Sequence, residues 1–420
     1  MAAKVATKAW DARIWGHCWR VDMTLMEDTM TFPTAETPTA AYSRNHPFLA
    51  GLIGHDRLTR PGSLKDTRHF ILSLAGSGLT YTPGDSLGAF GCNAPEVVDE
   101  LVSVLGFDPA TPVSGGKGLT RTFREALLQE VTVNRANRKL IAALAARAPQ
   151  GEQRDRLKAL MDQSDRLSEY INTRDYVDVL REFPGPRFES AADFLAQLTP
   201  ITPRLYSIAS SQQAHPNEVH LCVAIVRYDT HGRPKKGLAS GFLADHAGMF
   251  VKSIPVYVQV SRAFRLPPDR SRDIIMVGPG AGIAPFRAFL EQRAVEGASG
   301  RNWLFFGEQH RATDFLYETE WAEHQRRGTL HRLDLAFSRD QPERIYVQDR
   351  MREQARELWA WLQGGAYFYV CGDARNMAKG VHQALIDIAC QQGGLSPEAA
   401  AHYVHVTLMK TEGRYLRDVY

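Results

Sequence analysis

The segment Asp273–Leu290, DIIMVGPGAGIAPFRAFL, constrains the fold of this chain more than any other segment. A short apolar run, Ile274–Val277, predicts a buried strand that leads into a helix-compatible stretch. Between the two lie three glycines, Gly278, Gly280 and Gly282. Glycines let backbone N–H groups approach an anion, and a helix N-terminus adds favourable partial charge. The segment therefore predicts a pyrophosphate seat. Its spacing differs from the usual dinucleotide fingerprint, and a tight turn in an ordinary α/β unit is the alternative.

The rest of the chain after this segment alternates between strand and helix patterns. Further apolar runs predict strands at NWLFFG, LHRLDLAFS, AYFYVCG and VHVTLMK, with helical stretches between them. Such alternation predicts an α/β domain with a doubly wound parallel sheet over residues 269–420.

The part of the chain before residue 269 contains strand and helix patterns in separate blocks. Strand patterns occupy residues 45–92 and 199–268 and include RHFILSL, RLYSIAS, NEVHLCVAIVRYD and SIPVYVQVSRAF. Residues 93–198 are instead rich in Ala, Leu, Arg and Glu at helical spacing. We therefore expect a β domain (45–92 and 199–268) interrupted by a helical insertion (93–198). Residues 1–44 form an N-terminal extension to which no fold is assigned.

The composition is that of an ordinary globular protein and argues against several kinds of function. The chain is 44% hydrophobic and 23% charged, and its net charge of +3 is too small to indicate nucleic-acid binding. No apolar run approaches the roughly 20 residues that span a bilayer, and the N-terminus lacks the apolar core of a secretion signal. The five cysteines are scattered without metal-site spacing, which favours a reducing compartment: Cys18, Cys92, Cys222, Cys371 and Cys390. We expect a soluble, cytoplasmic protein with no metal site and no nucleic-acid or membrane partner.

Two segments of the β part suit a ligand with phosphate groups. In RLYS (204–207) the period of two places Arg204 and Tyr206 on one strand face. A guanidinium beside an aromatic ring suits a ligand with a phosphate and a flat ring, and a solvent-exposed pair is the alternative. The second segment, Lys236–Leu243, is rich in small residues and has Ser240 as a candidate N-cap before FLADHA. It therefore predicts a further phosphate seat.

A third cluster follows the apolar strand LDLAF, where a doubly wound sheet binds the adenosine end of a dinucleotide. The hydroxyl of Ser338 and the guanidinium of Arg339 fit a 2′-phosphate, whereas an acid that binds a bare ribose would indicate the non-phosphorylated cofactor. The segment Arg344–Gln348 adds a cation and an aromatic ring that could cover the adenine. A charged, solvated loop is the alternative for this cluster.

These segments together resemble the FAD/NADPH module of the diflavin reductase family, and most closely the flavoprotein subunit of NADPH-dependent sulfite reductase. The resemblance runs from about Asn45 to Tyr420 and rests on ordered motifs: RLYSIASS, KKGLASGFLADH, GPGAGIAPFRAF, NWLFFGEQHRATDFLY, DLAFSRDQPERIYVQD, YVCGDARNMAK and RYLRDVY. It implies an antiparallel β-barrel FAD domain with an inserted helical connecting domain, followed by the NADPH-binding α/β domain. It also implies an NADPH-dependent flavoprotein oxidoreductase that serves assimilatory sulfite reduction.

The resemblance implies which residues would hold FAD. Arg204 would contact the pyrophosphate, Ser207 would lie near the reactive edge of the flavin, and the terminal Tyr420 would stack on the flavin ring. A terminal Tyr rather than Trp favours the sulfite reductase branch. The other implied FAD contacts are Thr132, Tyr206, Cys222, Val223, Ala224, Tyr228, Gly237, Leu238, Ala239 and Ser240.

The resemblance likewise implies an NADPH site and a catalytic group. Ser338 and Arg339 match the 2′-phosphate binders. Further NADPH contacts would be Gly278, Gly280, Gly282, Arg344, Ile345, Tyr346, Val347 and Gln348. The group beside the nicotinamide would be Ser207, Cys371 and Asp418. Without the resemblance, a buried small side chain is the alternative for Cys371, and a surface carboxylate is the alternative for Asp418.

Three features depart from the family pattern. No flavodoxin-like FMN module precedes the FAD domain, which implies a separate electron acceptor (an FMN protein, a flavodoxin or the sulfite reductase haemoprotein) or a chain that is a fragment. Gly380 stands where the family commonly has an aspartate, and Arg344 replaces the usual lysine. Two alternatives to sulfite reduction stay open: a stand-alone flavodoxin/ferredoxin–NADP reductase, and a non-catalytic flavin-binding subunit.

Overall fold

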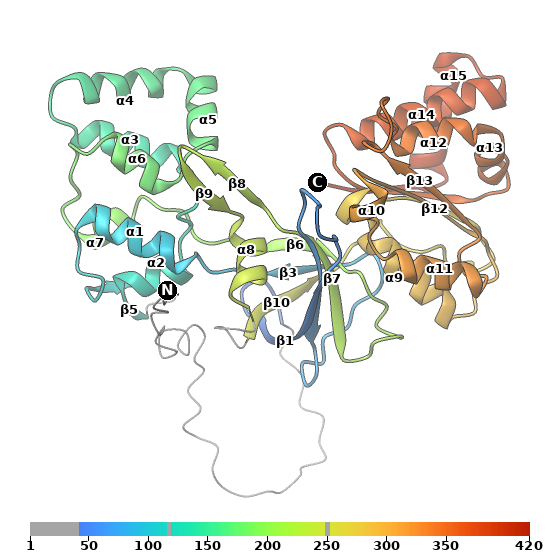
Figure 1. Cartoon of the computed structure of the whole chain (residues 1–420), viewed down its shortest axis with the longest axis horizontal. Coiled ribbons are helices and arrows are strands. Elements are labelled where there is room, and N and C mark those ends of the chain that lie inside the picture. The colour runs from blue at the N-terminus through green and yellow to red at the C-terminus, as the bar shows by residue number, and fades with distance from the viewer. Residues whose placement is uncertain (1–41, 116–118, 248–252) are drawn as a thin grey trace, which may run out of the picture. The chain divides into compact units, whose positions relative to one another are not determined.

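The computed structural model describes residues 42–115, 119–247 and 253–420, which fall into two compact units (Figure 1). The helical unit contains the described residues of 89–204 and 225–255, and the sheet unit contains 42–88, 205–224 and 256–420. Of the predicted N-terminal extension, residues 1–41 lie outside the described residues. The predicted domain boundaries differ from this division and stay a prediction.

The helical unit is a small helix bundle with two short hairpins. Its apolar positions recur at helical spacing and meet in one core that includes Phe123, Leu140, Tyr176 and Phe194, each fully buried. The helices are α1 (Pro95–Leu105), α2 (Phe123–Gln129), α3 (Arg138–Arg147), α4 (Glu152–Asp162), α5 (Ser164–Asn172), α6 (Tyr176–Glu182), α7 (Ala191–Leu195) and α8 (Leu238–Asp245). The hairpins pair β4 (Pro112–Ser114) with β5 (Thr120–Thr122), and β8 (Arg227–Thr230) with β9 (Arg233–Lys236).

A six-stranded sheet, which belongs mainly to the sheet unit, has the order β6-β3-β10-β1-β2-β7. Its strands are β1 (Phe48–Arg57), β2 (Thr67–Ser73), β3 (Ser86–Ala89), β6 (Arg204–Ser207), β7 (Glu218–Ala224) and β10 (Ser253–Gln259). β2 pairs antiparallel with both β1 and β7. An isolated bridge between Ile208 and Leu221 joins the chain after β6 to β7, so the two edges of the sheet meet as in a barrel.

The sheet unit also holds a five-stranded sheet of order β13-β12-β11-β14-β15, in which every neighbouring pair is parallel. Its strands are β11 (Ile274–Val277), β12 (Asn302–Glu308), β13 (Arg332–Phe337), β14 (Tyr367–Gly372) and β15 (Tyr415–Val419). The connecting helices are η3 (Gly280–Ile283), α9 (Ala284–Val295), α10 (Arg311–Asp314), α11 (Glu318–Arg326), α12 (Val347–Glu353), α13 (Ala355–Gln363), α14 (Met377–Gly393) and α15 (Pro397–His402).

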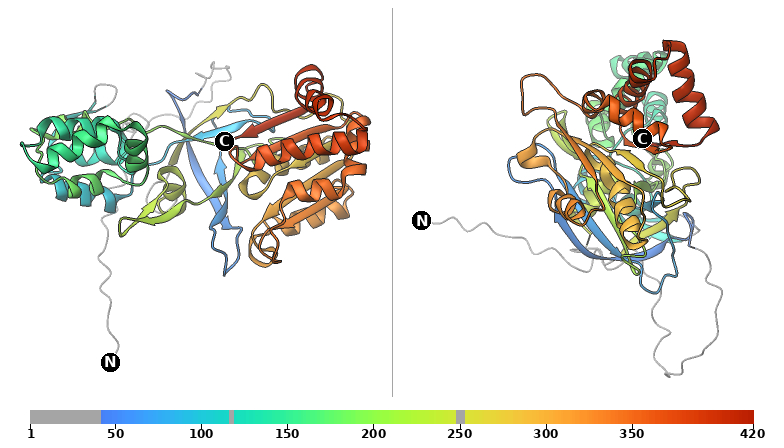
Figure 2. Two further views of the ribbon diagram at one scale, coloured as in Figure 1. Left: turned by 90° about the horizontal axis from the view of Figure 1, so that it is seen from above. Right: turned by 90° about the vertical axis from the view of Figure 1, so that its right-hand side faces the viewer.

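Helices cover both faces of this parallel sheet (Figure 2). Ile275 and Val277 pack into one apolar core with residues of α12–α14, whereas Ile274 and Met276 pack into another with residues of α9 and α11. Burial on both faces explains why β11 is a continuous apolar run rather than an alternating one. The predicted fold class, an antiparallel FAD-type domain with a helical insertion and a doubly wound parallel sheet, is confirmed.

One predicted strand is wrong. The run VHVTLMK lies in a π-helix, Tyr403–Thr411, that continues α15, and the last strand is β15, Tyr415–Val419. The alternation of apolar and polar residues suggested a strand, but Val404 and Leu408 are both buried, four residues apart, as on one face of a helix. Among the helices of the described residues, none is long and apolar enough to cross a bilayer.

Candidate functional site

A cavity of about 560 Å³ opens at the carboxyl edge of the parallel sheet. Loops that follow β11, β12, β13 and β14 line it, and this is the edge at which doubly wound sheets bind ligands. We call it the sheet-edge cavity. The predicted NADPH residues that line it are Gly280, Ser338, Arg339, Arg344, Tyr346, Val347 and Gln348.

The three glycines after β11 have different roles. Gly280 has a φ of 58°, which favours glycine, and it alone of the three lines the sheet-edge cavity. A Cβ on Gly282 would lie 2.3 Å from the carbonyl oxygen of Cys371, and one on Gly278 would lie 2.6 Å from the carbonyl oxygen of Gly282. Gly282 therefore lets the loop pack closely against the end of β14, and Gly278 lets the loop turn tightly against Gly282 and the Phe286 ring, which leaves Gly280 at the cavity wall.

The predicted 2′-phosphate cluster presents free cations at the end of β13. The backbone N–H groups of Ser338 and Arg339 donate to the carbonyls of Glu308 and Gln309, which fixes the loop. Within the described residues, the guanidiniums of Arg339 and Arg344 have no hydrogen-bond or ion-pair partner, and both side chains are exposed. Two unneutralised guanidiniums at one cavity favour an anionic ligand.

The neighbouring acid, Asp340, is already engaged. Its Oδ1 lies 2.9 Å from Nδ1 of His310, and its Oδ2 accepts the N–H of Arg311 at 2.8 Å. The hydrogen bond from the Arg311 backbone, with help from His310, holds the pKa of Asp340 below its usual value. This carboxylate does not line the sheet-edge cavity, so it is not placed to bind a bare ribose there.

Sequence reasoning missed several residues that line the cavity. Lys65 reaches it from the loop between β1 and β2, and its Nζ lies 2.7 Å from Oε2 of the buried Glu308. Asp373 and Asn376 line the cavity after β14. Lys65 belongs to no recognisable motif. It lies more than two hundred residues before the glycine segment, so the sequence gives no sign that the two meet at one cavity.

Two residues that the sequence analysis singled out, Ile345 and Gly380, do not line the sheet-edge cavity. Ile345 packs against the apolar core of α12–α14 and does not line the cavity. Gly380 lies beside a lining residue, because a Cβ built on it would be 3.3 Å from the side-chain amide of Gln348. A larger residue at position 380 would therefore press on Gln348, whereas the glycine leaves this side chain undisturbed.

Ser207, Cys371 and Asp418 come together in the sheet unit. The parallel pairing of β14 with β15 sets Cys371 opposite Asp418. The hydroxyl of Ser207 donates to Asp418 Oδ2 at 2.6 Å, and the Cys371 sulfur lies 3.8 Å from the same oxygen. Burial, together with the nearby Asp418, raises the pKa of the Cys371 thiol well above its usual value. Burial therefore favours the neutral thiol over the reactive thiolate.

The terminal Tyr420 is held by its backbone. Its N–H donates to the carbonyl of Gly372 at 3.1 Å, and its own carbonyl accepts the N–H of Ala374 at 3.1 Å. Its side chain is 58% exposed. The main chain is thus fixed at the end of β14 while the ring remains accessible, as a stacking residue requires.

Other predicted FAD residues of the sheet unit differ in exposure. Tyr206 is half-buried and Ala224 is exposed, whereas Cys222 and Val223 are buried. The Cys222 thiol lies beside the Tyr317 hydroxyl, and burial raises its pKa to about 12. The side chain of Cys222 thus belongs to the core, so any contact it makes with FAD would use its backbone.

The predicted phosphate seat at residues 237–240 lies in the helical unit, and its cap was predicted wrongly. The N-cap of α8 is Gly237, not Ser240, and the helix begins at Leu238. Ser240 lies inside the first turn, where its Oγ accepts the N–H of Val226 at 3.2 Å. A Cβ on Gly237 would be 2.6 Å from that Oγ, so the glycine is what allows this close turn. That the N-terminus of α8 binds a phosphate group stays a prediction.

The remaining candidate FAD contacts, Thr132, Arg204 and Tyr228, also lie in the helical unit. Arg204 is exposed, and Tyr228 is 44% exposed on β8. Thr132 is half-buried, and its N–H donates to the carbonyl of Thr199 at 2.8 Å. These residues are accessible to a ligand, and their roles in FAD binding stay predictions.

Buried ion pairs hold β9, the strand that leads into this seat. Lys235 contacts both Asp175 and Asp178, with 2.6 Å between its Nζ and Asp178 Oδ2. Arg233 contacts the same two acids at 2.7 and 2.8 Å. Asp175 and Asp178 also form the capping box of α6. This buried clamp fixes β9 to α6, so the loop after β9 has a defined position.

One cluster of possible metal ligands occurs among the described residues: His215, Glu218 and His220. Arg287 Nη1 lies 3.4 Å from His220 Nδ1, and a guanidinium can only donate. Nδ1 therefore accepts, so Nε2 carries the proton that faces Glu218 at 3.0 Å. His220 has no lone pair left for a metal on that side, and we interpret the cluster as a hydrogen-bond network.

Comparisons with known proteins agree with this geometry. The family described as FAD binding domain matches residues 40–242, and the family described as oxidoreductase NAD-binding domain matches residues 276–383. The chain therefore joins an FAD-binding domain to an oxidoreductase NAD-binding domain. The predicted cofactors, FAD and NADPH, agree with these two domains and are confirmed.

The particular flavoproteins it resembles are sulfite reductase (NADPH) flavoprotein alpha-components. The chain is 44% identical to those of Mannheimia succiniciproducens, Bacillus subtilis and Vibrio cholerae, over 90%, 92% and 93% of its own length. This likeness confirms the resemblance that the sequence motifs indicated. It spans 62% to 63% of the length of these relatives.

Proposed function

We propose that this chain takes electrons from NADPH onto FAD and passes them to a separate acceptor protein, most directly in sulfite reduction. One observation carries the proposal: Ser207, Cys371 and Asp418, far apart in sequence, meet at the carboxyl edge of the parallel sheet. The sheet-edge cavity supports a phosphorylated dinucleotide as the electron donor, because the guanidiniums of Arg339 and Arg344 have no partner in the part of the chain that the structure describes.

The nicotinamide and the flavin supply the hydride chemistry themselves, so the protein contributes position and electrostatics. The Ser207 hydroxyl holds Asp418 Oδ2, which fixes the direction of the carboxylate. A fixed negative charge stabilises a positive charge that develops beside it. The neutral, buried thiol of Cys371 fills the space next to the carboxylate without adding a second charge.

Turnover with a small one-electron acceptor tests the reductase activity. The FAD-loaded chain should oxidise NADPH in the presence of ferricyanide, and it should prefer NADPH to NADH. The non-catalytic alternative, a subunit that binds FAD only structurally, predicts no turnover with either nucleotide. Absence of NADPH oxidation by protein that retains FAD would therefore overturn the proposal.

The acceptor is inferred from the relatives, which are named as components of sulfite reductase. We take the sulfite reductase haemoprotein as the final acceptor, reached directly or through an FMN protein. Offering the chain plus NADPH a sulfite reductase haemoprotein, with and without an FMN protein, and a free flavodoxin in separate assays distinguishes the possibilities. Reduction of flavodoxin alone would favour the alternative, a stand-alone flavodoxin/ferredoxin–NADP reductase. A cytoplasmic location stays a prediction.

A further inference from the structure

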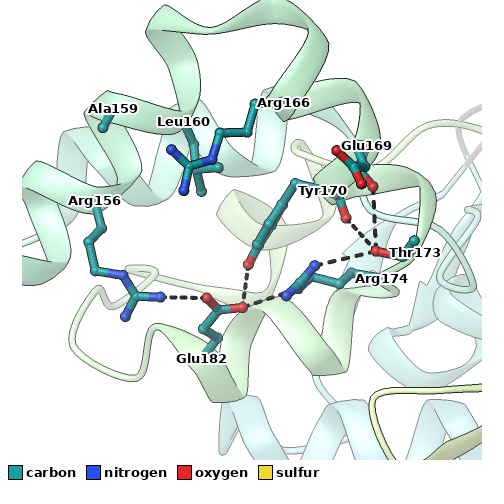
Figure 3. Close-up of a pocket in the computed structure, with 9 residues that line it drawn as sticks. All are labelled: Arg156, Ala159, Leu160, Arg166, Glu169, Tyr170, Thr173, Arg174 and Glu182. Atoms are coloured by element: carbon teal, nitrogen blue, oxygen red, sulfur yellow. Dashed lines mark hydrogen bonds and ion pairs between the residues drawn. The ribbon is translucent and has the colours of Figure 1, made fainter.

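The helical unit contains a second cavity, of about 370 Å³, that none of the predicted cofactor residues lines (Figure 3). It lies among α4, α5 and the end of α6, and we call it the arginine cavity. Three arginines line it: Arg156 from α4, Arg166 from α5 and Arg174 from the loop before α6. Because they come from separate elements, no helical repeat explains their convergence.

A single carboxylate is shared by two of these arginines. Arg156 donates to Glu182 Oε1 at 2.7 Å, and Arg174 donates to Glu182 Oε2 at 3.1 Å. The hydroxyl of Tyr170 donates to the same Oε2 at 2.7 Å. One negative charge thus faces two positive charges, and its oxygens already accept three hydrogen bonds.

The third arginine has no counter-charge. Within the described residues, Arg166 has no hydrogen-bond or ion-pair partner. Figure 3 shows its guanidinium over the cavity on the side of Arg156, whereas the carboxylate of Glu169 lies on the other side of Tyr170. Glu169 and Glu182 both line the cavity, so its lining carries three guanidiniums and two carboxylates, an excess of one positive charge.

The walls of the cavity complete a pocket for a small ligand. Ala159 and Leu160 give it an apolar side, and the Tyr170 ring is covered by Arg174, whose guanidinium carbon is 3.9 Å from the ring centroid. Arginine forks match the paired oxygens of phosphate and carboxylate groups. We propose that the arginine cavity binds a small oxyanion of the phosphate class, such as inorganic phosphate or a compact phosphate ester.

This site is independent of the proposed electron transfer. Its residues lie on α4–α6, and none of them is a predicted FAD or NADPH contact. The experiment must nevertheless exclude anion binding at the cofactor sites, which also hold phosphate groups. Titrations are therefore made on the full chain with FAD and NADP+ both saturating, at low ionic strength, because salt screens partly exposed charges.

Calorimetric titration with inorganic phosphate, and separately with malonate, tests the proposal on three variants. Arg166→Gln removes the unpaired guanidinium and should weaken phosphate binding about tenfold, the effect of one charge-assisted hydrogen bond reduced by solvent. Glu182→Gln removes the competing carboxylate and should tighten binding. The matched control, Arg187→Gln, removes an exposed arginine that lines a different cavity of the same unit and should leave binding unchanged.

The titrations either support the proposed phosphate site or overturn it. Saturable phosphate binding that is weakened in Arg166→Gln and retained in Arg187→Gln supports the site, and tighter binding of phosphate than of malonate supports the phosphate class. Equal affinities in wild type, Arg166→Gln and Arg187→Gln would overturn it, as would the absence of saturable phosphate binding at millimolar concentrations. If Glu182→Gln does not fold, the comparison of Arg166→Gln with Arg187→Gln still tests the proposed site. FAD retention and NADPH oxidation should be normal in Arg166→Gln, so failure here is distinct from failure of the proposed function.

Discussion

Asp418 is the residue on which the proposed chemistry depends most. It is half-buried, its carboxylate oxygen accepts a hydrogen bond from Ser207 at 2.6 Å, and the Cys371 sulfur lies 3.8 Å from the same oxygen. Neither neighbour carries a positive charge, and within the described part of the chain Asp418 has no ion-pair partner. An unneutralised carboxylate can stabilise positive charge on a bound ring.

We predict that Asp418→Asn slows the reduction of bound FAD by NADPH about 10- to 100-fold, the effect of losing one charged interaction. FAD affinity should be nearly unchanged, because the substitution keeps the shape of the side chain. Anaerobic stopped-flow measurement of flavin reduction gives the rate. Asp387→Asn, on α14, removes an exposed carboxylate and serves as the control. Equal rates in both variants would remove Asp418 from the mechanism.

Arg339 should determine the preference for the phosphorylated nucleotide. Its guanidinium lines the sheet-edge cavity and has no partner among the described residues. We predict that Arg339→Gln weakens NADPH binding about 10- to 100-fold and leaves NADH binding almost unchanged. Steady-state KM values for the two nucleotides measure this. Arg326→Gln, on α11, is the control. A parallel loss for NADPH and NADH would mean that Arg339 acts on something other than the 2′-phosphate.

At the scale of elements, close backbone packing positions the sheet-edge cavity. The loop after β11 passes so near the end of β14 that only glycine fits at residue 282, and it turns so tightly on itself that only glycine fits at residue 278. The capping box of α6 is tied to β9 by the buried clamp of Arg233 and Lys235. In both cases a small number of contacts fixes a loop that carries candidate ligand contacts.

Gly282→Ala should disrupt the loop after β11. The added Cβ would lie 2.3 Å from a backbone oxygen that cannot move aside without shifting β14. We expect a loss of about 1–3 kcal/mol in the free energy of unfolding and a marked loss of NADPH affinity. Gly51→Ala, in β1, adds a Cβ that meets nothing within 4 Å and is the matched control. Urea unfolding and NADP+ titration would show the difference, and a neutral Gly282→Ala would contradict the packing argument.

The buried clamp predicts a specific dependence on pH. Burial alone would raise the pKa of Asp178, but hydrogen bonds from Lys235, the Asp175 backbone and Arg233 outweigh it and lower the pKa from 3.8 to about 2. A carboxylate with a lowered pKa contributes stability that is present above about pH 4 and is lost as the pH falls through about 2.

Asp178→Asn should therefore destabilise the protein by about 2–3 kcal/mol at neutral pH, because the buried Lys235 and the partly buried Arg233 lose a partner. The difference from wild type should shrink as the pH falls from 4 towards 2. Urea unfolding followed by circular dichroism over this range measures it. Asp162→Asn, an exposed position at the end of α4, should have little effect at any pH. A constant difference between Asp178→Asn and wild type at all pH values would show that charge is not the cause.

At the scale of the whole molecule, the sequence predicted most of the architecture. Apolar runs such as Ile274–Val277 are buried on both faces, so the alternation of such runs with helical stretches was enough to predict the parallel sheet. The prediction of a strand at 404–410 is wrong because Val404 and Leu408 suit both structures. Residues four apart lie on one face of a strand and also on one face of a helix. The helix cap at Gly237 was missed because Ser240 has the more common capping side chain.

The candidate site could be predicted only in part. Arg339 and Arg344 follow a strand in sequence, so strand-end logic found them without any structure. Ser207 and Asp418 are 211 residues apart in the chain, and no local pattern joins them. They were found through the family resemblance. Lys65 was not found at all, because its approach to Glu308 depends on how the chain folds rather than on any motif.

The central claim is that NADPH reduces FAD bound to this chain. The most direct test mixes the FAD-loaded chain anaerobically with one equivalent of NADPH and follows the flavin and nicotinamide absorbances together. We predict that the two signals decay at the same rate, with one nicotinamide oxidised for each flavin that is bleached. A flavin that remains yellow while NADPH persists, or a chain that does not retain FAD, would contradict the account.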